Sequence, residues 1–286
     1  MSAWDLFSYG FMQRALIAAT LTGLAAPIVG TYLVQRRLSL MGDGLGHVAV
    51  TGVALGLLTG TSPTWTAVIV AVLGAVAIEL IRERGHAGGD VALALLFYGG
   101  LAGGVLLSGL AGKSAATLQE YLFGSITTIG VGDVLITMAL AAVVLVIGLG
   151  LAPQLYAVAN DRDFAQVAGL PVRWYNLLVA TLAAVSVTVA MHTVGLLLVS
   201  ALMVIPVATS QQLTRTFRST LGLAMVLGLV ASLGGLLIST FASFHATVAP
   251  GPSIVLLALA CFVVAWPTGV LLRRRRVGVP TADPPA

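Results

Sequence analysis

Long apolar runs recur along the whole sequence, and they constrain the fold more than any other feature. Each run is roughly 17 to 25 residues long, enough for a helix to cross a hydrocarbon core about 30 Å thick. The chain has 286 residues, of which 58% are hydrophobic and 8% are charged, and its mean hydropathy is +1.04. This composition excludes a soluble globular protein. Because the strands of a membrane barrel alternate apolar and polar residues, the continuous runs predict helices.

The predicted fold class is an all-α polytopic membrane protein. About nine transmembrane helices are expected, near residues 11–34, 43–60, 63–81, 91–111, 132–152, 173–192, 193–211, 219–241 and 252–272. The runs at 173–192 and 193–211 meet at MHTVG with almost no loop, so eight spans is the alternative. Residues 1–272 are expected to form a single transmembrane domain, and residues 273–286 a basic, disordered cytoplasmic tail that is rich in proline.

Basic residues indicate the orientation of the chain. With Arg36 and Arg37 in the cytoplasm, every lysine and arginine except Arg14 and Lys113 falls on the cytoplasmic side, as the positive-inside bias predicts. The N-terminus is then outside and the C-terminus is in the cytoplasm. The run Arg273–Arg276 would anchor the last helix at anionic lipid headgroups. No soluble basic domain is expected, so a nucleic acid partner is excluded.

A nucleotide-binding motif is missing in the form that an ATPase needs. The segment SGLAGKSAA resembles a phosphate-binding loop, but Leu107 stands where that motif has its first glycine. If ATP drives this protein, a separate chain must bind and hydrolyse it. An intramembrane hydrolase is not supported either, because the sequence has no paired catalytic acids and no metalloprotease helix motif. We therefore expect a transport subunit rather than an enzyme.

The segment AVANDRDFAQVAGLPVRWYN predicts a short cytoplasmic helix near residues 160–170. Asn160 or Asp161 can cap its start, and Asp163 suits the positive end of the helix dipole. Gly169 can close its end. The apolar side chains on this helix are Phe164, Val167, Ala168 and Leu170. Such a helix either docks into a groove of a partner protein or rests on lipid headgroups, and the local sequence leaves both open.

Asp43 and His47 stand in the second apolar run, within LMGDGLGHVAVTGVALG. A carboxylate inside a span costs on the order of 2.5 to 3.5 kcal/mol, so it is retained where it faces a cavity, a partner or an ion. Residues four apart share a helix face, so the pair can offer an oxygen and a nitrogen to one point. These donors suit zinc, manganese or iron. The alternatives are a helix cap for Asp43 and a hydrogen bond to a neighbouring helix for His47.

Glycines surround this pair of candidate ligands. Gly42, Gly44 and Gly46 leave the backbone beside the pair unobstructed. Gly52 and Gly56 form a face of small residues that favours close helix packing. Two ligands are too few for a tetrahedral site, and a twofold dimer would supply four.

Five segments together resemble the zinc and manganese permease family of ATP-binding-cassette importers. They are RRLSLMGDGLGHVAVTGVALG, EYLFGSITTIGVGDV, DRDFAQVAGLPVRWYN, HTVGLLLVSALMVIPVATSQQL and APGPSIVL, in the order that the family has them and over nearly the whole chain. The resemblance implies a fold similar to that of the cobalamin and siderophore importers, in which two identical permeases flank a central pathway. It also implies that Asp43 and His47 are pathway metal ligands.

The same resemblance implies the partners of the chain. The permease would form a homodimer in the lipid of a bacterial inner membrane, with a cytoplasmic dimer of ATPases and an extracytoplasmic metal-binding protein. The predicted short helix would be the coupling helix that sits on the ATPase. Its coupling residues would be Asp161, Asp163, Phe164, Ala165, Ala168, Gly169 and Leu170.

The transported substrate is expected to be a divalent transition metal, and no permanently bound cofactor is expected. GHVAVTGVALG looks more like the zinc branch of the family, because the manganese branch often has proline where this chain has Thr51. The segment LLFYGG lacks a histidine that some zinc members have, which speaks against zinc. On balance zinc is favoured over manganese or iron, since ligand type does not separate them. The alternatives are a same-fold permease for a metal chelate such as a siderophore, and a proton-coupled secondary transporter.

Three further polar residues lie near the ends of the predicted spans. His192 and His245 map to the outer face, where either would help to receive an ion, although an interfacial histidine is more often only tolerated. Glu79 lies one turn before Arg82 and Arg84, so it is expected to pair with them or to snorkel.

Overall fold

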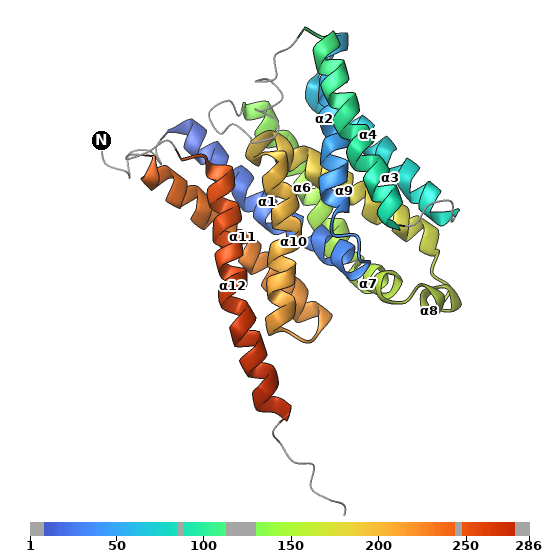
Figure 1. The fold of residues 1–286 in the computed structure, drawn as a ribbon, viewed down its shortest axis with the longest axis vertical. Coiled ribbons are helices and arrows are strands. Elements are labelled where there is room, and N and C mark those ends of the chain that lie inside the picture. The colour runs from blue at the N-terminus through green and yellow to red at the C-terminus, as the bar shows by residue number, and fades with distance from the viewer. Residues whose placement is uncertain (1–8, 85–88, 113–129, 244–247, 278–286) are drawn as a thin grey trace, which may run out of the picture.

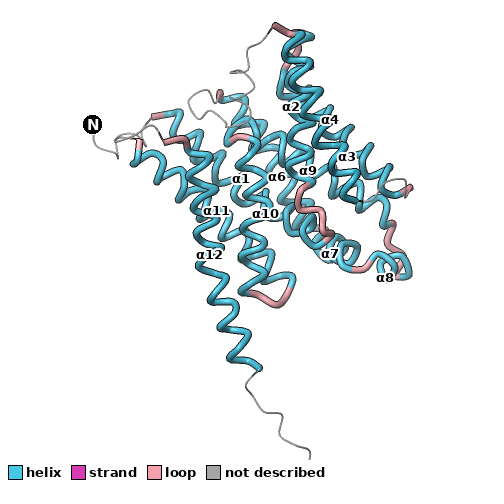
Figure 2. Tube along the Cα trace, in the orientation of Figure 1, coloured by secondary structure: helices cyan, strands magenta, loops and turns pink. Residues whose placement is uncertain are grey.

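The chain is described by a computed structural model that covers residues 9–84, 89–112, 130–243 and 248–277. Within these ranges it consists of helices and turns, with no strand (Figure 2). The prediction of an all-α polytopic fold is therefore confirmed. The helices, in chain order, are α1 (Gly10–Gln35), α2 (Met41–Thr59), α3 (Pro63–Glu83), α4 (Gly89–Leu110), α6 (Val131–Gly150), α7 (Ala152–Asn160), α8 (Arg162–Val167), α9 (Val172–Val194), α10 (Leu196–Leu213), α11 (Phe217–Ala242) and α12 (Pro250–Val277).

The number of membrane spans is close to the predicted number. Among the described residues, 7 helices are long and apolar enough to cross a membrane, and there are 8 if α6 and α7, which meet at a bend of 70°, count as one span. The span predicted at 193–211 forms α10, whose 18 residues make it shorter than the helices at the other predicted spans. α12 continues past the predicted domain end at residue 272 to Val277. Because arginine is a good helix former, the basic run can continue this helix.

Two groups of helices flank a central pair (Figure 1). α2 packs against α3 and α4 on one side, and α10, α11 and α12 pack together on the other. α1 and α9 lie between the groups, since α1 contacts α10, α11, α6 and α9, while α9 also contacts α2, α3 and α10. Both central helices are rich in small apolar residues, which allows neighbouring backbones to approach closely.

Glycines of α2 allow this helix to approach α3 and α10. A Cβ atom at Gly46 would overlap Leu196 of α10, and one at Gly52 would stand 2.6 Å from the Cα atom of Ala67 in α3. Such approaches require that the position carry no side chain. The predicted close packing at the small-residue face of α2 is therefore confirmed.

The contact between α2 and α4 fixes the backbone of α2 next to His47. A Cβ atom at Gly100 of α4 would stand 2.6 Å from the backbone nitrogen of Val48 and 2.7 Å from the carbonyl carbon of His47. The hydroxyl of Thr51 donates to the carbonyl oxygen of Gly100 at 2.5 Å, one turn further along α2. The backbone that carries His47 is thus held against α4 by both packing and a hydrogen bond.

We expect Gly100→Ala to destabilise the protein, because the added methyl group would meet backbone atoms that cannot rotate away. Overpacking of this kind costs about 1 to 3 kcal/mol. Gly99→Ala is the matched control, since a Cβ atom at Gly99 has nothing within 4 Å. Thermal unfolding in detergent measures the difference between the two variants. Equal unfolding midpoints would contradict the close contact between α2 and α4.

Candidate functional site

Asp43 lies in the first turn of α2, and its carboxylate is unpaired. The residue before this helix, Leu40, makes no side-chain cap hydrogen bond, and the only acidic residue in the first turn is Asp43. Among the described residues, none forms a hydrogen bond or an ion pair with the Asp43 carboxylate. The alternative of a capping role for Asp43 is therefore not supported by the structure.

His47 follows one turn later on the same helix and is buried, with 8% of its surface exposed. Its Nδ1 atom has no hydrogen-bond partner in the described part of the chain. The imidazole ring instead packs edge-on against Phe97 of α4, with 4.3 Å between ring centroids. The alternative of a hydrogen bond to a neighbouring helix is therefore not supported by the geometry at Nδ1. A buried ring nitrogen without a partner remains available as a ligand.

A hollow of about 320 Å³ opens beside Asp43. Its lining residues come from the start of α2 and from α4: Leu40, Asp43, Leu93, Ala94, Phe97 and Tyr98. Asp43 is the only ionisable acid in this mostly apolar lining. An acid in such surroundings is costly unless a cation or a polar partner compensates it. The hollow therefore has the charge and the size to admit a small cation.

The described residues of one chain supply only these two candidate donors. They contain no group of three or more histidine, cysteine, aspartate or glutamate side chains that could hold a metal ion together. One carboxylate and one imidazole suit manganese, iron or zinc, but a tight site needs further ligands. Within the described residues, one protomer thus offers two donors of these types at this position.

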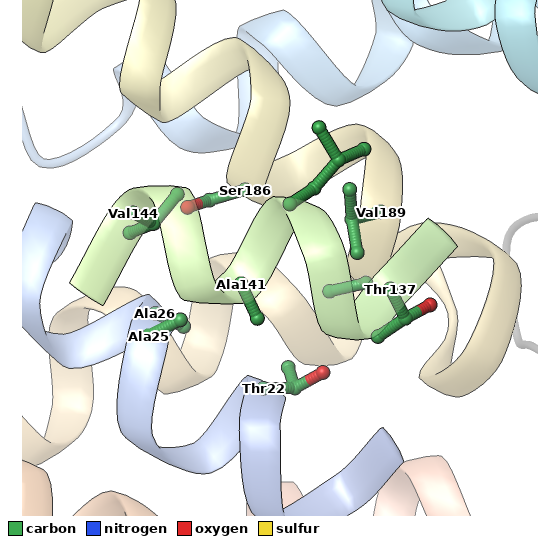
Figure 3. Close-up of a pocket in the computed structure, with 10 residues that line it drawn as sticks. Thr22, Ala25, Ala26, Thr137, Ala141, Val144, Ser186 and Val189 are labelled. Carbon is green, nitrogen blue, oxygen red and sulfur yellow. The ribbon is translucent and has the colours of Figure 1, made fainter. Parts of the chain in front are cut away.

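A second cavity, between α1, α6 and α9, has a different character (Figure 3). Its volume of about 10 Å³ leaves room for one water molecule. Its polar groups are the hydroxyls of Thr22, Thr137 and Ser186, and those of Thr22 and Ser186 are buried without a hydrogen-bond partner. Because it has no carboxylate or imidazole, this cavity is not a candidate ion site.

The predicted short helix is α8, and it is shorter than the predicted range of 160–170. Oδ1 of Asp161 accepts a hydrogen bond from the backbone N–H of Phe164 at 3.0 Å, which confirms Asp161 as the cap. Gly169 has a φ of 81°, a conformation that favours glycine and ends the helical segment. The side chains of Phe164 and Val167 are exposed by 66% and 89%, whereas Ala165 is fully buried.

Ala165, one of the predicted coupling residues, is buried, unlike its neighbours on α8. Ala165 packs against Val158 of α7 and Val172 of α9, with Leu170 beside them. It therefore anchors α8 to the bundle and does not belong to the exposed docking surface. The sequence pattern could not separate Ala165 from Ala168, which is exposed, because a helix of six residues has no clear periodicity.

Two predicted residues cannot be placed at the site. His192 lies in α9, but its side chain is outside the described part of the structure, and His245 lies outside the described residues altogether.

The sequence analysis missed the aromatic wall of the hollow and two ion pairs between helices, Arg36 with Glu79 and Arg173 with Glu83. Phe97 and Tyr98 line the hollow, although LLFYGG drew attention only for lacking a histidine. Glu79 pairs with Arg82 as expected, and also with Arg36, which stands at the end of α1. Contacts between helices carry no local signal in the sequence, so neither feature could be found there.

Comparisons with known proteins identify the family of the chain. Residues 8–268 match the family model described as "ABC 3 transport family". The chain is 32% identical to the manganese transport system membrane protein MntC of Halalkalibacterium halodurans, over 92% of this chain and 88% of that protein. It is 31% identical to the chelated iron transport system membrane protein YfeD of Yersinia pestis, over 91% of this chain and 86% of that protein.

A solved structure of a related protein has a similar fold. The chain is similar to PsaBC from Streptococcus pneumoniae in complex with Fab, with a TM-score of 0.83 and 31% identity over 96% of this chain and 98% of that one. The chain belongs to the ABC 3 transport family, the metal importer permeases that its motifs resemble, and it is a membrane-spanning transport subunit rather than an enzyme.

Proposed function

We propose that this chain is the permease of an ATP-driven importer in which Asp43 and His47 hold a divalent transition metal on its way through the membrane. The observation that carries the proposal is the pair of unpartnered donors, one turn apart on α2 and next to a hollow. Both side chains are costly to keep in apolar surroundings without an ion or partner. A site with few ligands binds weakly, which suits a conduit that must release its ion.

A second copy of the chain completes this site in the proposal. Two donors from each protomer give four ligands on a twofold axis, which is enough for a transition metal. The face of α4 beside the hollow supports this arrangement, because Tyr98 is 69% exposed there and Ala94 is also exposed. In the proposed homodimer, α2 and α4 of both protomers border the pathway.

The ATPase is a separate chain that binds at α8. The exposed apolar side chains of Phe164 and Val167 support this docking role, since each would leave water on contact with a partner. The remaining coupling residues in the proposal are Asp161, Asp163, Ala168, Gly169 and Leu170. The positive-inside bias places α8 in the cytoplasm, with the N-terminus outside and the C-terminus inside. A metal-binding protein delivers the ion from the outside.

The identity of the transported ion is the most specific part of the proposal. The names of the relatives include manganese and iron, and we propose manganese ahead of zinc on that ground. The preference for zinc rested on Thr51, whose hydroxyl binds the backbone of α4 and so has a packing role. His192 and His245 remain candidates for receiving the ion on the outer face.

We expect Asp43→Asn to reduce ATP-driven uptake of Mn²⁺ by at least about tenfold, because it replaces the anionic carboxylate by a neutral amide, a weaker donor, without changing side-chain size. Uptake is measured with the ATPase and the delivery protein reconstituted together with the permease, and Zn²⁺ is compared in parallel. Asp283→Asn, in the C-terminal tail, is the matched control. Unchanged uptake would argue against a ligand role and favour a permease for a metal chelate. Uptake that follows a proton gradient without the ATPase would favour a secondary transporter.

Ala94→Cys in a Cys261→Ala background should cross-link two permeases with a short bifunctional maleimide, because the proposal places α4 at the twofold axis. Cys261 is the only cysteine of the chain, so no other thiol competes. Ala260→Cys on α12 is the control, since that residue is equally exposed on a helix of the opposite group. Denaturing electrophoresis reads the result. A dimer with Ala260→Cys and none with Ala94→Cys would contradict the proposed axis.

Val167→Asp should abolish co-purification with the ATPase, because it places a charge in the proposed apolar contact. The permease should remain folded, because the side chain of Val167 is already 89% exposed. Leu213→Asp, at the end of α10, is the control for adding an acid to an exposed apolar position. Size-exclusion chromatography of the detergent-solubilised assembly measures both properties. Retention of the ATPase by Val167→Asp would contradict docking at α8.

A further inference from the structure

Glu79 of α3 is buried between two arginines that come from different helix ends. Its side chain is 2% exposed, and Oε1 accepts from Nη2 of Arg36 while Oε2 accepts from Nη1 of Arg82, both at 2.7 Å. We call these three residues the Glu79 cluster. Removing three charged groups from water costs desolvation free energy, and this cost can exceed the free energy gained from their mutual attraction. A buried cluster of this kind is therefore weak evidence for a stabilising role. A role in function would explain better why the protein keeps these three charges buried.

Two polar contacts tie the flanks of α8 to the helices that the Glu79 cluster joins. Before α8, Nε2 of Gln35 donates to Oδ1 of Asn160 at 3.1 Å, which links the end of α1 to the end of α7. After α8, Nε of Arg173 lies 3.0 Å from Oε2 of Glu83, which links the start of α9 to the end of α3. A displacement of α8 therefore acts on α1 and α3 through both flanks.

The turn after Arg36 connects the cluster to α2 with little freedom. Arg37 has a φ of 58°, which is uncommon for a residue with a side chain. The backbone N–H of Leu38 donates to the carbonyl of Leu33 at 2.8 Å, and the side chain of Leu38 is buried. This pattern closes the end of α1 tightly. Movement of Arg36 is thus passed to the first turn of α2, which carries Asp43.

Unsatisfied polar groups in the cluster and in α9, which packs against α3, point to a second arrangement. Nη1 of Arg36 and both amide atoms of Asn176 in α9 are buried without hydrogen-bond partners among the described residues. Burial lowers the pKa of Arg36, the Glu79 carboxylate raises it, and the charges of Arg82 and Arg162 lower it. Because Arg162 is the first residue of α8, movement of α8 changes the electric field at the cluster.

We propose that Glu79 is a positioning residue that couples the movement of α8 to the access of Asp43, an inference that rests on the proposed importer function. Force on α8 reaches α1 through Asn160 and α3 through Arg173. The Glu79 cluster makes these two helices move together, and the turn after Arg36 carries the movement to α2. No proton or bond is exchanged in this step, which consists of shifts of ion pairs and hydrogen bonds.

Glu79→Gln tests the proposal, because it keeps the shape of the side chain and removes its charge. In proteoliposomes with the ATPase and the delivery protein, we expect ATP hydrolysis within twofold of the wild type and Mn²⁺ uptake at least tenfold lower, so that fewer ions move per ATP. Binding of Mn²⁺ to the solubilised assembly should be unchanged. Arg84→Gln, at an exposed neighbouring position, is the control and should keep the wild-type ratio. An unchanged ratio of ions to ATP in Glu79→Gln would overturn the inference.

A charge exchange tests the link between α9 and α3 without disturbing the buried carboxylate. Glu83→Arg alone should lower the ratio of ions to ATP, and the double variant Glu83→Arg with Arg173→Glu should restore it. If Glu79→Gln does not fold, the comparison of the single and double variants tests the inference instead. Equal ratios in the single and double variants would overturn the inference. Absence of ATP-driven Mn²⁺ uptake by the wild-type assembly would instead contradict the proposed function.

Discussion

The cost of keeping an acid and an imidazole in apolar surroundings is the constraint on which the account depends. Asp43 and His47 have no polar partner among the described residues, yet both stand on a helix that is otherwise apolar. The fold holds the pair in place by close packing of α2 against α3, α4 and α10, which the glycines make possible. The backbone of the pair is therefore held in place, and in the proposal a cation and a second protomer complete the site.

In the proposal, α2 is also connected to α8, the helix on which the ATPase acts. α8 presents exposed apolar side chains, while Ala165 fastens it to the bundle. From there a series of polar contacts leads through α1 and α3 to Glu79, and the tight turn at Arg37 leads on to Asp43. The proposed metal site and the proposed docking helix are thus joined by short, directional contacts rather than by the apolar core.

Local sequence signals account for much of this structure. Apolar runs predicted the long helices, and the Asp161 cap and Gly169 were visible as ordinary start and stop signals. The features that the sequence did not reveal depend on contacts between helices. Arg36 and Glu79 are 43 positions apart, and the tertiary arrangement of the bundle brings the end of α1 to the buried carboxylate of α3. The side of α8 that faces inward likewise depends on α7 and α9, which is why the burial of Ala165 was not foreseen.

Anomalous scattering at the manganese edge, recorded from the complete assembly loaded with Mn²⁺, tests the central claim most directly. The account predicts one peak on the twofold axis, in contact with the carboxylate of Asp43 and the imidazole of His47 from both protomers. A peak bound by other residues, or a dimer in which α2 faces lipid and lies away from the axis, would contradict it.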